Sequence, residues 1–166
     1  MSVLYAVLGA VAAQRAAEFA FAAANARRLL ARGASEHDPA GHAALVAVHA
    51  LWLLAMAATI PAAAAPSWPL LAVYAALQPA RLWVVASLGR RWTTRLIVPA
   101  GMAPVRRGPY RYLRHPNYLV VVGEVAILPL AFGAILLALA FSAANLALIV
   151  RRIRAEDAAW APLREA

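Results

Sequence analysis

The chain has 166 residues, of which 64% are hydrophobic and only 14% are charged, and its formal net charge is +9. Soluble domains are about half apolar and about a quarter charged. This composition, with a mean hydropathy of +0.69, therefore excludes an ordinary soluble protein and predicts an integral membrane protein. There is no cysteine and every basic residue is arginine, which excludes disulfides, thiolate chemistry, cysteine-based zinc sites and amine nucleophiles.

The arginines gather at the ends of apolar runs instead of forming a stripe on one face. This placement is typical of topology signals and of contacts with anionic head groups, so membrane lipids are expected partners and nucleic acid is not. His37 and His42 lie near two carboxylates, but their spacing matches no compact metal motif, and no metal site is expected. His49 stands one turn before Trp52 and is expected to pack within its helix with a satisfied hydrogen bond.

Apolar runs divide the chain into five predicted membrane spans. They are Val3–Ala24, Ala43–Ile60, Leu70–Leu88, Asn117–Leu130 and Ala134–Val150. The fourth run reaches only about 21 Å at ~1.5 Å per residue, so its polar start is expected to lie at the membrane boundary. Basic clusters follow the first, third and fifth runs, which places the N-terminus outside and the C-terminus inside. The fold class predicted is an all-α membrane protein of about five transmembrane helices, ending in a helical hairpin.

Charged residues inside the spans are expensive in lipid and must face protein or water. Arg15 and Glu18 stand at i, i+3 and can pair on one helical face, either to orient the first helix or to contribute to a ligand pocket. Arg81 follows Pro79 by two residues, and it either satisfies the carbonyl that the proline frees or lines a cavity. Glu124 lies within the fourth span, where a role in a pocket is expected.

The stretch from Arg106 to Tyr118 concentrates arginines, aromatic rings and a histidine between apolar runs. Because turn-forming prolines and glycines precede it, residues 98–110 are predicted to form an irregular loop. The helical hairpin should bring the tail at 151–157 back to the same face as this loop. Arg152 and Glu156, at i, i+4 in that tail, form either an ordinary charge pair or a site for a zwitterionic ligand.

Two segments of the chain resemble the hallmark segments of the isoprenylcysteine carboxyl methyltransferase family. They are Arg114-His115-Pro116-Asn117-Tyr118 and Arg152-Ile153-Arg154-Ala155-Glu156-Asp157. The family pattern is Arg-His-Pro-x-Tyr followed, after a helical hairpin, by Arg-Ile-x-x-Glu-Glu, and the order and spacing agree over about residues 80 to 160. Asp157 departs from the pattern at its second acidic position, and Val120 stands where a glycine is usual.

The resemblance implies a membrane methyltransferase that binds S-adenosyl-L-methionine at the cytosolic ends of the last helices. By position, Gly108, Pro109 and Tyr110 would frame the adenosine. His115, Pro116 and Tyr118 would line the cofactor pocket, and Arg152 and Glu156 would contact cofactor or substrate at the reacting centre. Candidates for the substrate pocket are Glu124, Arg81 and Trp92.

With its Gly33-Ala34-x-Glu36 loop, the chain also resembles bacterial members of the family associated with type III polyketide synthases. This resemblance implies O-methylation of a lipophilic anion, such as a carboxylate or the acidic enol of an alkylpyrone, at the bacterial inner membrane. A single methyltransferase domain is expected over 1–166, with three spans in 1–88 and the cofactor loop, hairpin and tail in 89–166. Two alternatives are an NADPH-dependent reductase of the steroid-reductase-like type and a lipid-binding membrane protein without enzymatic activity.

Overall fold

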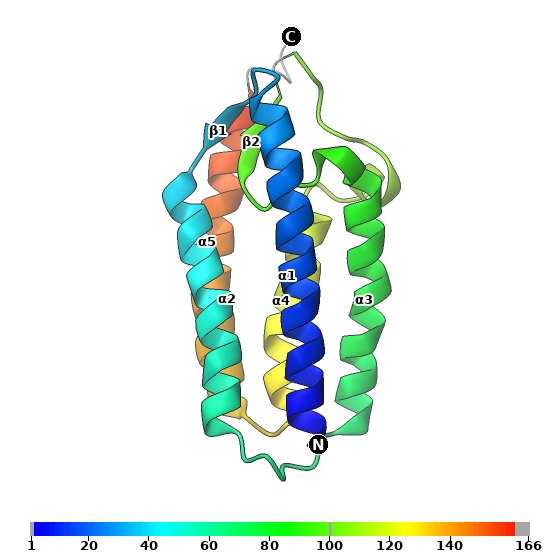
Figure 1. The fold of residues 1–166 in the computed structure, drawn as a ribbon, viewed down its shortest axis with the longest axis vertical. Coiled ribbons are helices and arrows are strands. Elements are labelled where there is room, and N and C mark those ends of the chain that lie inside the picture. The colour runs from blue at the N-terminus through cyan, green and yellow to red at the C-terminus, as the bar shows by residue number, and fades with distance from the viewer. Residues whose placement is uncertain (1, 100, 162–166) are drawn as a thin grey trace.

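The computed structural model describes residues 2–99 and 101–161, and these form a bundle of five roughly parallel and antiparallel α-helices (Figure 1). The helices are α1 (Val3–Leu30), α2 (Pro39–Thr59), α3 (Trp68–Leu88), α4 (Pro116–Ala131) and α5 (Ile135–Trp160). Among the described residues, four helical segments are long and apolar enough to cross a membrane. The exception, α4, has 16 residues and spans about 24 Å. The predicted all-α membrane fold is confirmed.

The helix ends follow their local sequence. Ser2 caps α1 by accepting a hydrogen bond from the backbone N–H of Tyr5 at 3.3 Å. α1 continues six residues past the predicted end at Ala24, because Arg27 and Arg28 in its last turn suit the negative end of a helix dipole. The basic cluster predicted to follow the first span therefore begins within the last turn of the helix.

A tight turn joins α4 to α5, as the predicted hairpin requires. Pro129 lies in the last turn of α4, and Gly133 follows with a φ of +74°. The backbone N–H of Ala134 donates to the carbonyl of Pro129 at 3.0 Å, which closes the turn. Left-handed backbone at this position favours glycine, so the break between the two apolar runs is a helix C-terminus with a defined geometry.

A small antiparallel sheet closes one end of the bundle, and the sequence patterns did not predict it. It pairs β1 (Ser35–His37) with β2 (Leu96–Val98). Ile97 of β2 is buried against Leu29 of α1. Two short 3-10 helices, η1 (Gly89–Arg91) and η2 (Gly108–Arg111), complete this end. The predicted irregular loop at 98–110 is therefore confined to 99–107, of which residue 100 lies outside the described part.

The main hydrophobic core occupies the end of the bundle opposite the sheet. Its most buried side chains include Leu4, Met56 and Leu128, from α1, α2 and α4. α4 packs against both α3 and α5, and α5 also packs against α2. The α2–α3 linker and the α4–α5 turn lie beyond this core, whereas the sheet and the long loop lie together at the other end (Figure 1). We call these the core end and the loop end.

Candidate functional site

The start of α4 and the last turns of α5 meet at the loop end, as the hairpin predicted. The carboxylate of Glu156 accepts a hydrogen bond from the Tyr118 hydroxyl. Its other oxygen lies 3.0 Å from Nδ1 of His115. The His115 and Tyr118 rings stack with their centroids 5.6 Å apart. Glu156 thus receives two contacts from α4, and these fix its orientation.

Arg152 is held at the same place and is 3% exposed. Its Nη2 donates to the carbonyl of Thr94 at 3.1 Å, and its Nε lies 3.5 Å from Glu156. Asp38, which precedes α2, approaches Nη1 only to 3.8 Å. This nitrogen, like Nε2 of His115, is buried without a hydrogen-bond partner. Because leaving a buried polar group unpaired costs about 1–3 kcal/mol, both atoms indicate a place for a ligand.

A cavity of about 580 Å³ begins at these residues and continues into the bundle. Its size lies within the usual range of ligand sites, about 300–1,000 Å³. Of the residues predicted for the site, seven line it: Arg81, Trp92, Tyr110, His115, Tyr118, Arg152 and Glu156. Between its two polar ends the walls carry apolar side chains, including Leu45, Val46, Leu53, Val121 and Ile149. The cavity therefore offers a polar mouth followed by an apolar chamber.

The remaining predicted site residues lie outside this lining. Gly108 has a φ of +57°, and a Cβ atom there would come within 2.0 Å of the Ser87 hydroxyl. Pro109 is buried beside it, and Pro116 occupies the first turn of α4. These three residues seat η2 and the start of α4 against α3. They position the wall of the cavity without forming its surface.

Tyr110 belongs to η2, and its aromatic side chain lines the cavity. Burial, and secondarily the negative charge of Glu156, raise the pKa of the Tyr110 phenol above its usual value. The phenol therefore keeps its proton at neutral pH. It is available as a hydrogen-bond donor to a ligand.

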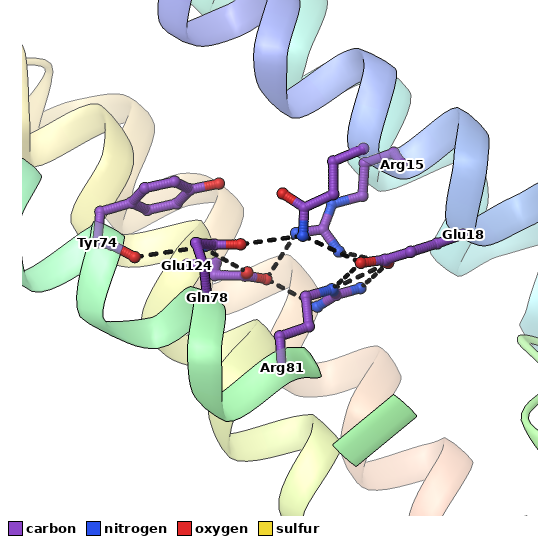
Figure 2. Close-up of polar contacts among 7 residues, drawn as sticks. Arg15, Glu18, Tyr74, Gln78, Arg81 and Glu124 are labelled. Atoms are coloured by element: carbon purple, nitrogen blue, oxygen red, sulfur yellow. Dashed lines mark hydrogen bonds and ion pairs between the residues drawn. The ribbon is translucent and has the colours of Figure 1, made fainter. Parts of the chain in front are cut away.

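Charged side chains from three helices form a cluster (Figure 2), and Arg15, Glu18 and Arg81 of this cluster line the cavity. Arg15 of α1 lies 3.1 Å from Glu18 and 2.9 Å from Glu124 of α4. Arg81 of α3 lies 2.7 Å from Glu18 and 2.9 Å from Glu124. Gln78 donates to Glu124 at 3.1 Å. Two guanidinium groups and two carboxylates thus bridge three helices.

The predicted pairing of Arg15 with Glu18 is confirmed, and the structure adds partners that the sequence did not show. Arg81 binds the two carboxylates and also lines the cavity, as one of its predicted alternatives had it. Glu124 lies behind Arg15 and Arg81 and outside the cavity lining, so it supports the wall from within the cluster.

Sequence reasoning missed the residues that reach the site from outside the two motifs. Asp38 and Thr94 flank Arg152, and His49 faces the cavity from α2. The expected hydrogen bond of His49 is present, at 2.8 Å to the Leu45 carbonyl. The local signal for Asp38 was its position before Pro39, which is typical of a helix N-cap.

Comparisons with known proteins agree with this arrangement. The family model for isoprenylcysteine carboxyl methyltransferases matches residues 70–162, which include the loop, the hairpin and the Arg152–Glu156 pair. An uncharacterised protein of Bacillus subtilis (strain 168), YpbQ, is 36% identical over 154 residues, which cover 88% of this chain and 89% of that relative. No solved structure matches the chain. The match supports a membrane methyltransferase, and the chain belongs to the isoprenylcysteine carboxyl methyltransferase family.

Proposed function

We propose that the protein is an S-adenosylmethionine-dependent O-methyltransferase that acts on a lipophilic anion at the membrane. The observation that carries this proposal is the polar mouth, in which Arg152 and Glu156 stand beside Tyr118 at the head of an apolar chamber. A cation, a carboxylate and hydroxyl donors suit a zwitterionic cofactor and an anionic acceptor. The chamber behind them suits the hydrocarbon part of a lipid.

The residues at the mouth fit S-adenosylmethionine. The buried Nη1 of Arg152 and Nε2 of His115 are unpaired. Nη1 would donate to a cofactor carboxylate, and Nε2, whose ring carries its proton on the Nδ1 that faces Glu156, would accept from a cofactor N–H group. Glu156 would accept from the cofactor ammonium, and the Tyr110 hydroxyl would donate to an acceptor atom of the cofactor. Gly108, Pro109 and Pro116 would act indirectly, by holding η2 and α4 in place. Bound there, the cofactor supplies an electrophilic methyl group for in-line transfer to an ionised acceptor oxygen.

The protein's own contribution is alignment in a place poor in water. A carboxylate or an acidic enol is already ionised near neutral pH, so no strong base is required. Arg152 orients the acceptor anion through an N–H of Nη1, and the contacts of Nη2 to Thr94 and of Nε to Glu156 keep the guanidinium group fixed. Effective molarity of this kind can supply about 7–11 kcal/mol of a barrier. The apolar walls exclude water that would stabilise the ionised acceptor before it reacts.

The acceptor proposed is a polyketide lipid such as an alkylpyrone, in keeping with the bacterial members associated with type III polyketide synthases. It combines an acidic enol with an alkyl chain, which matches a polar mouth above an apolar chamber. The loop end, with its arginines, is proposed to face the cytoplasm of a bacterial inner membrane, where the cofactor is made.

The test is methyl transfer by purified protein in detergent. We expect binding of S-adenosylhomocysteine by isothermal titration, and transfer of a labelled methyl group from S-adenosylmethionine to 6-alkyl-4-hydroxy-2-pyrones or long-chain fatty acids. Arg152→Ala and Glu156→Ala should each lower the rate at least about a hundredfold, because each removes a charged contact worth about 3 kcal/mol. Arg154→Ala, on an exposed face of the same helix turn, is the matched control and should keep its rate.

Full activity of both site variants would refute the site assignment. Stabilisation of the protein by NADPH but not by S-adenosylhomocysteine, measured as a thermal shift, would refute the methyltransferase in favour of a reductase.

A further inference from the structure

The cavity has a second polar end that the proposed methyl transfer does not use. Arg15, Glu18 and Arg81 form one wall of this inner end, and His49 of α2 also lines it. His49 lies close enough to Arg15 to interact with it electrostatically. A cavity meant only for hydrocarbon needs no such groups, because charges at membrane depth are expensive. Binding of hydrocarbon therefore does not explain the charged groups at the inner end.

The charge balance of the cluster indicates what kind of group fits there. Two guanidinium groups face two carboxylates at 2.7–3.1 Å, so the formal charges cancel. A second ion on a ligand would find no excess of opposite charge in this wall. A neutral group that forms hydrogen bonds suits it better.

The tautomer of His49 decides whether its ring donates a hydrogen bond to such a group or accepts one from it. Nδ1 of His49 lies 2.8 Å from the carbonyl oxygen of Leu45, and a carbonyl only accepts hydrogen bonds. Nδ1 therefore carries the ring proton, and Nε2 keeps its lone pair. The ring also makes an edge contact with Trp52, with the centroids 6.5 Å apart, which limits its rotation. His49 thus offers an acceptor, whereas Arg15 offers N–H donors.

The distance between the two polar ends follows from helix geometry. From Tyr118 at the mouth to Glu124 in the cluster, α4 advances six residues, and α2 advances seven from His42 to His49. At ~1.5 Å per residue the two intervals are about 9 Å and about 10.5 Å. Along this length the walls are apolar. A plain alkyl chain that filled the cavity would cover the polar groups of the inner end and displace water from them without offering hydrogen bonds of its own, which is unfavourable.

We propose that the inner end is a second subsite, which binds a neutral hydroxyl or keto group of the methyl acceptor. This group lies about 9–10.5 Å from the oxygen that is methylated. A hydroxyl group donates to Nε2 of His49 and accepts from Arg15, and a keto oxygen accepts from Arg15 alone. The subsite selects oxygenated acyl or polyketide chains over plain ones of equal length. This inference rests on the proposed methyl transfer.

The test compares pairs of acceptors that differ by one hydroxyl group. Each pair has a plain chain and a chain hydroxylated about 9–10.5 Å from the reacting oxygen, in a 6-alkyl-4-hydroxy-2-pyrone series and in a fatty acid series. In one of the two series the wild-type protein should show a kcat/KM at least about tenfold higher for the hydroxylated member, since one hydrogen bond contributes about 1.5 kcal/mol. His49→Leu should bring that ratio close to one.

Controls separate the subsite from a general loss of structure. His49→Phe keeps a ring beside Trp52 and removes both ring nitrogens, so it should lose the preference for the hydroxylated acceptor as His49→Leu does. If one of the two variants folds poorly, the other still tests the subsite. His37→Leu, in β1 and outside the cavity lining, should keep the wild-type ratio.

Each outcome decides one question. Turnover without a preference for the hydroxylated member in either series, or a preference that survives in the His49 variants, overturns the subsite and leaves the methyltransferase standing. Absence of both S-adenosylhomocysteine binding and turnover refutes the proposed function itself, and the subsite falls with it.

Discussion

At the residue scale, Tyr118 shows how one hydroxyl group can matter to the site. It donates to Glu156 while its ring stacks on His115. Tyr118→Phe keeps the ring and removes the donor, so the protein should still fold, with a melting temperature lowered by a few degrees. The rate of methyl transfer should fall about tenfold to a hundredfold, because a hydrogen bond to a charged group contributes about 1.5–3 kcal/mol. Steady-state kinetics with labelled S-adenosylmethionine measure this change.

The control for this substitution is Tyr112→Phe. Tyr112 is 73% exposed and lies beyond η2, next to Arg111. It should keep wild-type kinetics. A Tyr118→Phe protein as active as the control would show that Glu156 needs no hydroxyl donor to function.

The proximity of the motif residues is the part of the arrangement that the sequence could predict. Tyr110, His115, Tyr118, Arg152 and Glu156 all line one cavity, because a helical hairpin necessarily returns the tail to the loop. The pairing at i, i+3 or i, i+4 is likewise set by helix geometry alone.

Partners contributed by distant helices were not predictable in this way. Glu124 stands 109 residues after Arg15, and which of their turns meet depends on how the helices are rotated and shifted against each other. Hydrophobic periodicity does not fix that register when most positions around a membrane helix are apolar. The same reason hid the approach of Asp38 to Arg152.

At the scale of elements, Gly108 connects η2 to α3. Its φ of +57° and the 2.0 Å approach of an added Cβ to the Ser87 hydroxyl both oppose a side chain. Gly108→Ala should therefore lower the free energy of unfolding by about 2 kcal/mol or more, about 1 from the left-handed backbone and the rest from the clash. It should also weaken S-adenosylhomocysteine binding, since Tyr110 would move with η2. Thermal unfolding in detergent and titration calorimetry measure the two effects.

Gly33→Ala is the matched control, because Gly33 has a φ of +82° and open space around its Cβ position. Gly33→Ala should lower the free energy of unfolding by only about 1 kcal/mol, because only the left-handed backbone opposes the alanine there. Ser87→Gly combined with Gly108→Ala should recover part of the loss by removing the clashing atoms. Equal destabilisation by the two glycine substitutions would mean that η2 is not seated against Ser87 as described.

The small sheet is the element that sequence patterns did not predict. Strands of three residues are too short for an alternating pattern, and Ser35 pairs with Val98 across a long stretch of chain. Glu36 of β1 forms an ion pair with Arg95, which directly precedes β2. The sheet holds the α1–α2 connection over the site, which brings Asp38 to Arg152.

At the scale of the whole molecule, the arrangement of the two ends predicts a topology that can be tested directly. The chain has no cysteine, so a single introduced thiol reports one position. Ala62→Cys lies in the exposed α2–α3 linker at the core end, and Tyr112→Cys lies at the loop end. In intact bacterial cells a membrane-impermeant maleimide should label Ala62→Cys and leave Tyr112→Cys unlabelled. Labelling of both after the cells are broken is the control, and the reverse pattern in intact cells would place the site outside.

The fold at this scale was the easiest to predict. Helix order, the hairpin and the side of the bundle that carries the basic residues all follow from where apolar runs begin and end. The position of the cavity did not follow, because it depends on how far α1 stands from α2, α4 and α5. No local sequence pattern records that separation.

The charged cluster also has a consequence for how the protein is made. Arg15 and Glu18 enter the membrane with only each other as ionic partners, because Arg81 and Glu124 belong to helices that are synthesised later. At roughly 5–20 residues per second, the 109 residues from Arg15 to Glu124 take on the order of ten seconds to add. An arginine at the centre of a lone helix costs about 3 kcal/mol on insertion. α1 therefore enters the membrane with its charges incompletely paired. The insertion of α4, which carries Glu124, completes the pairing of these charges in lipid.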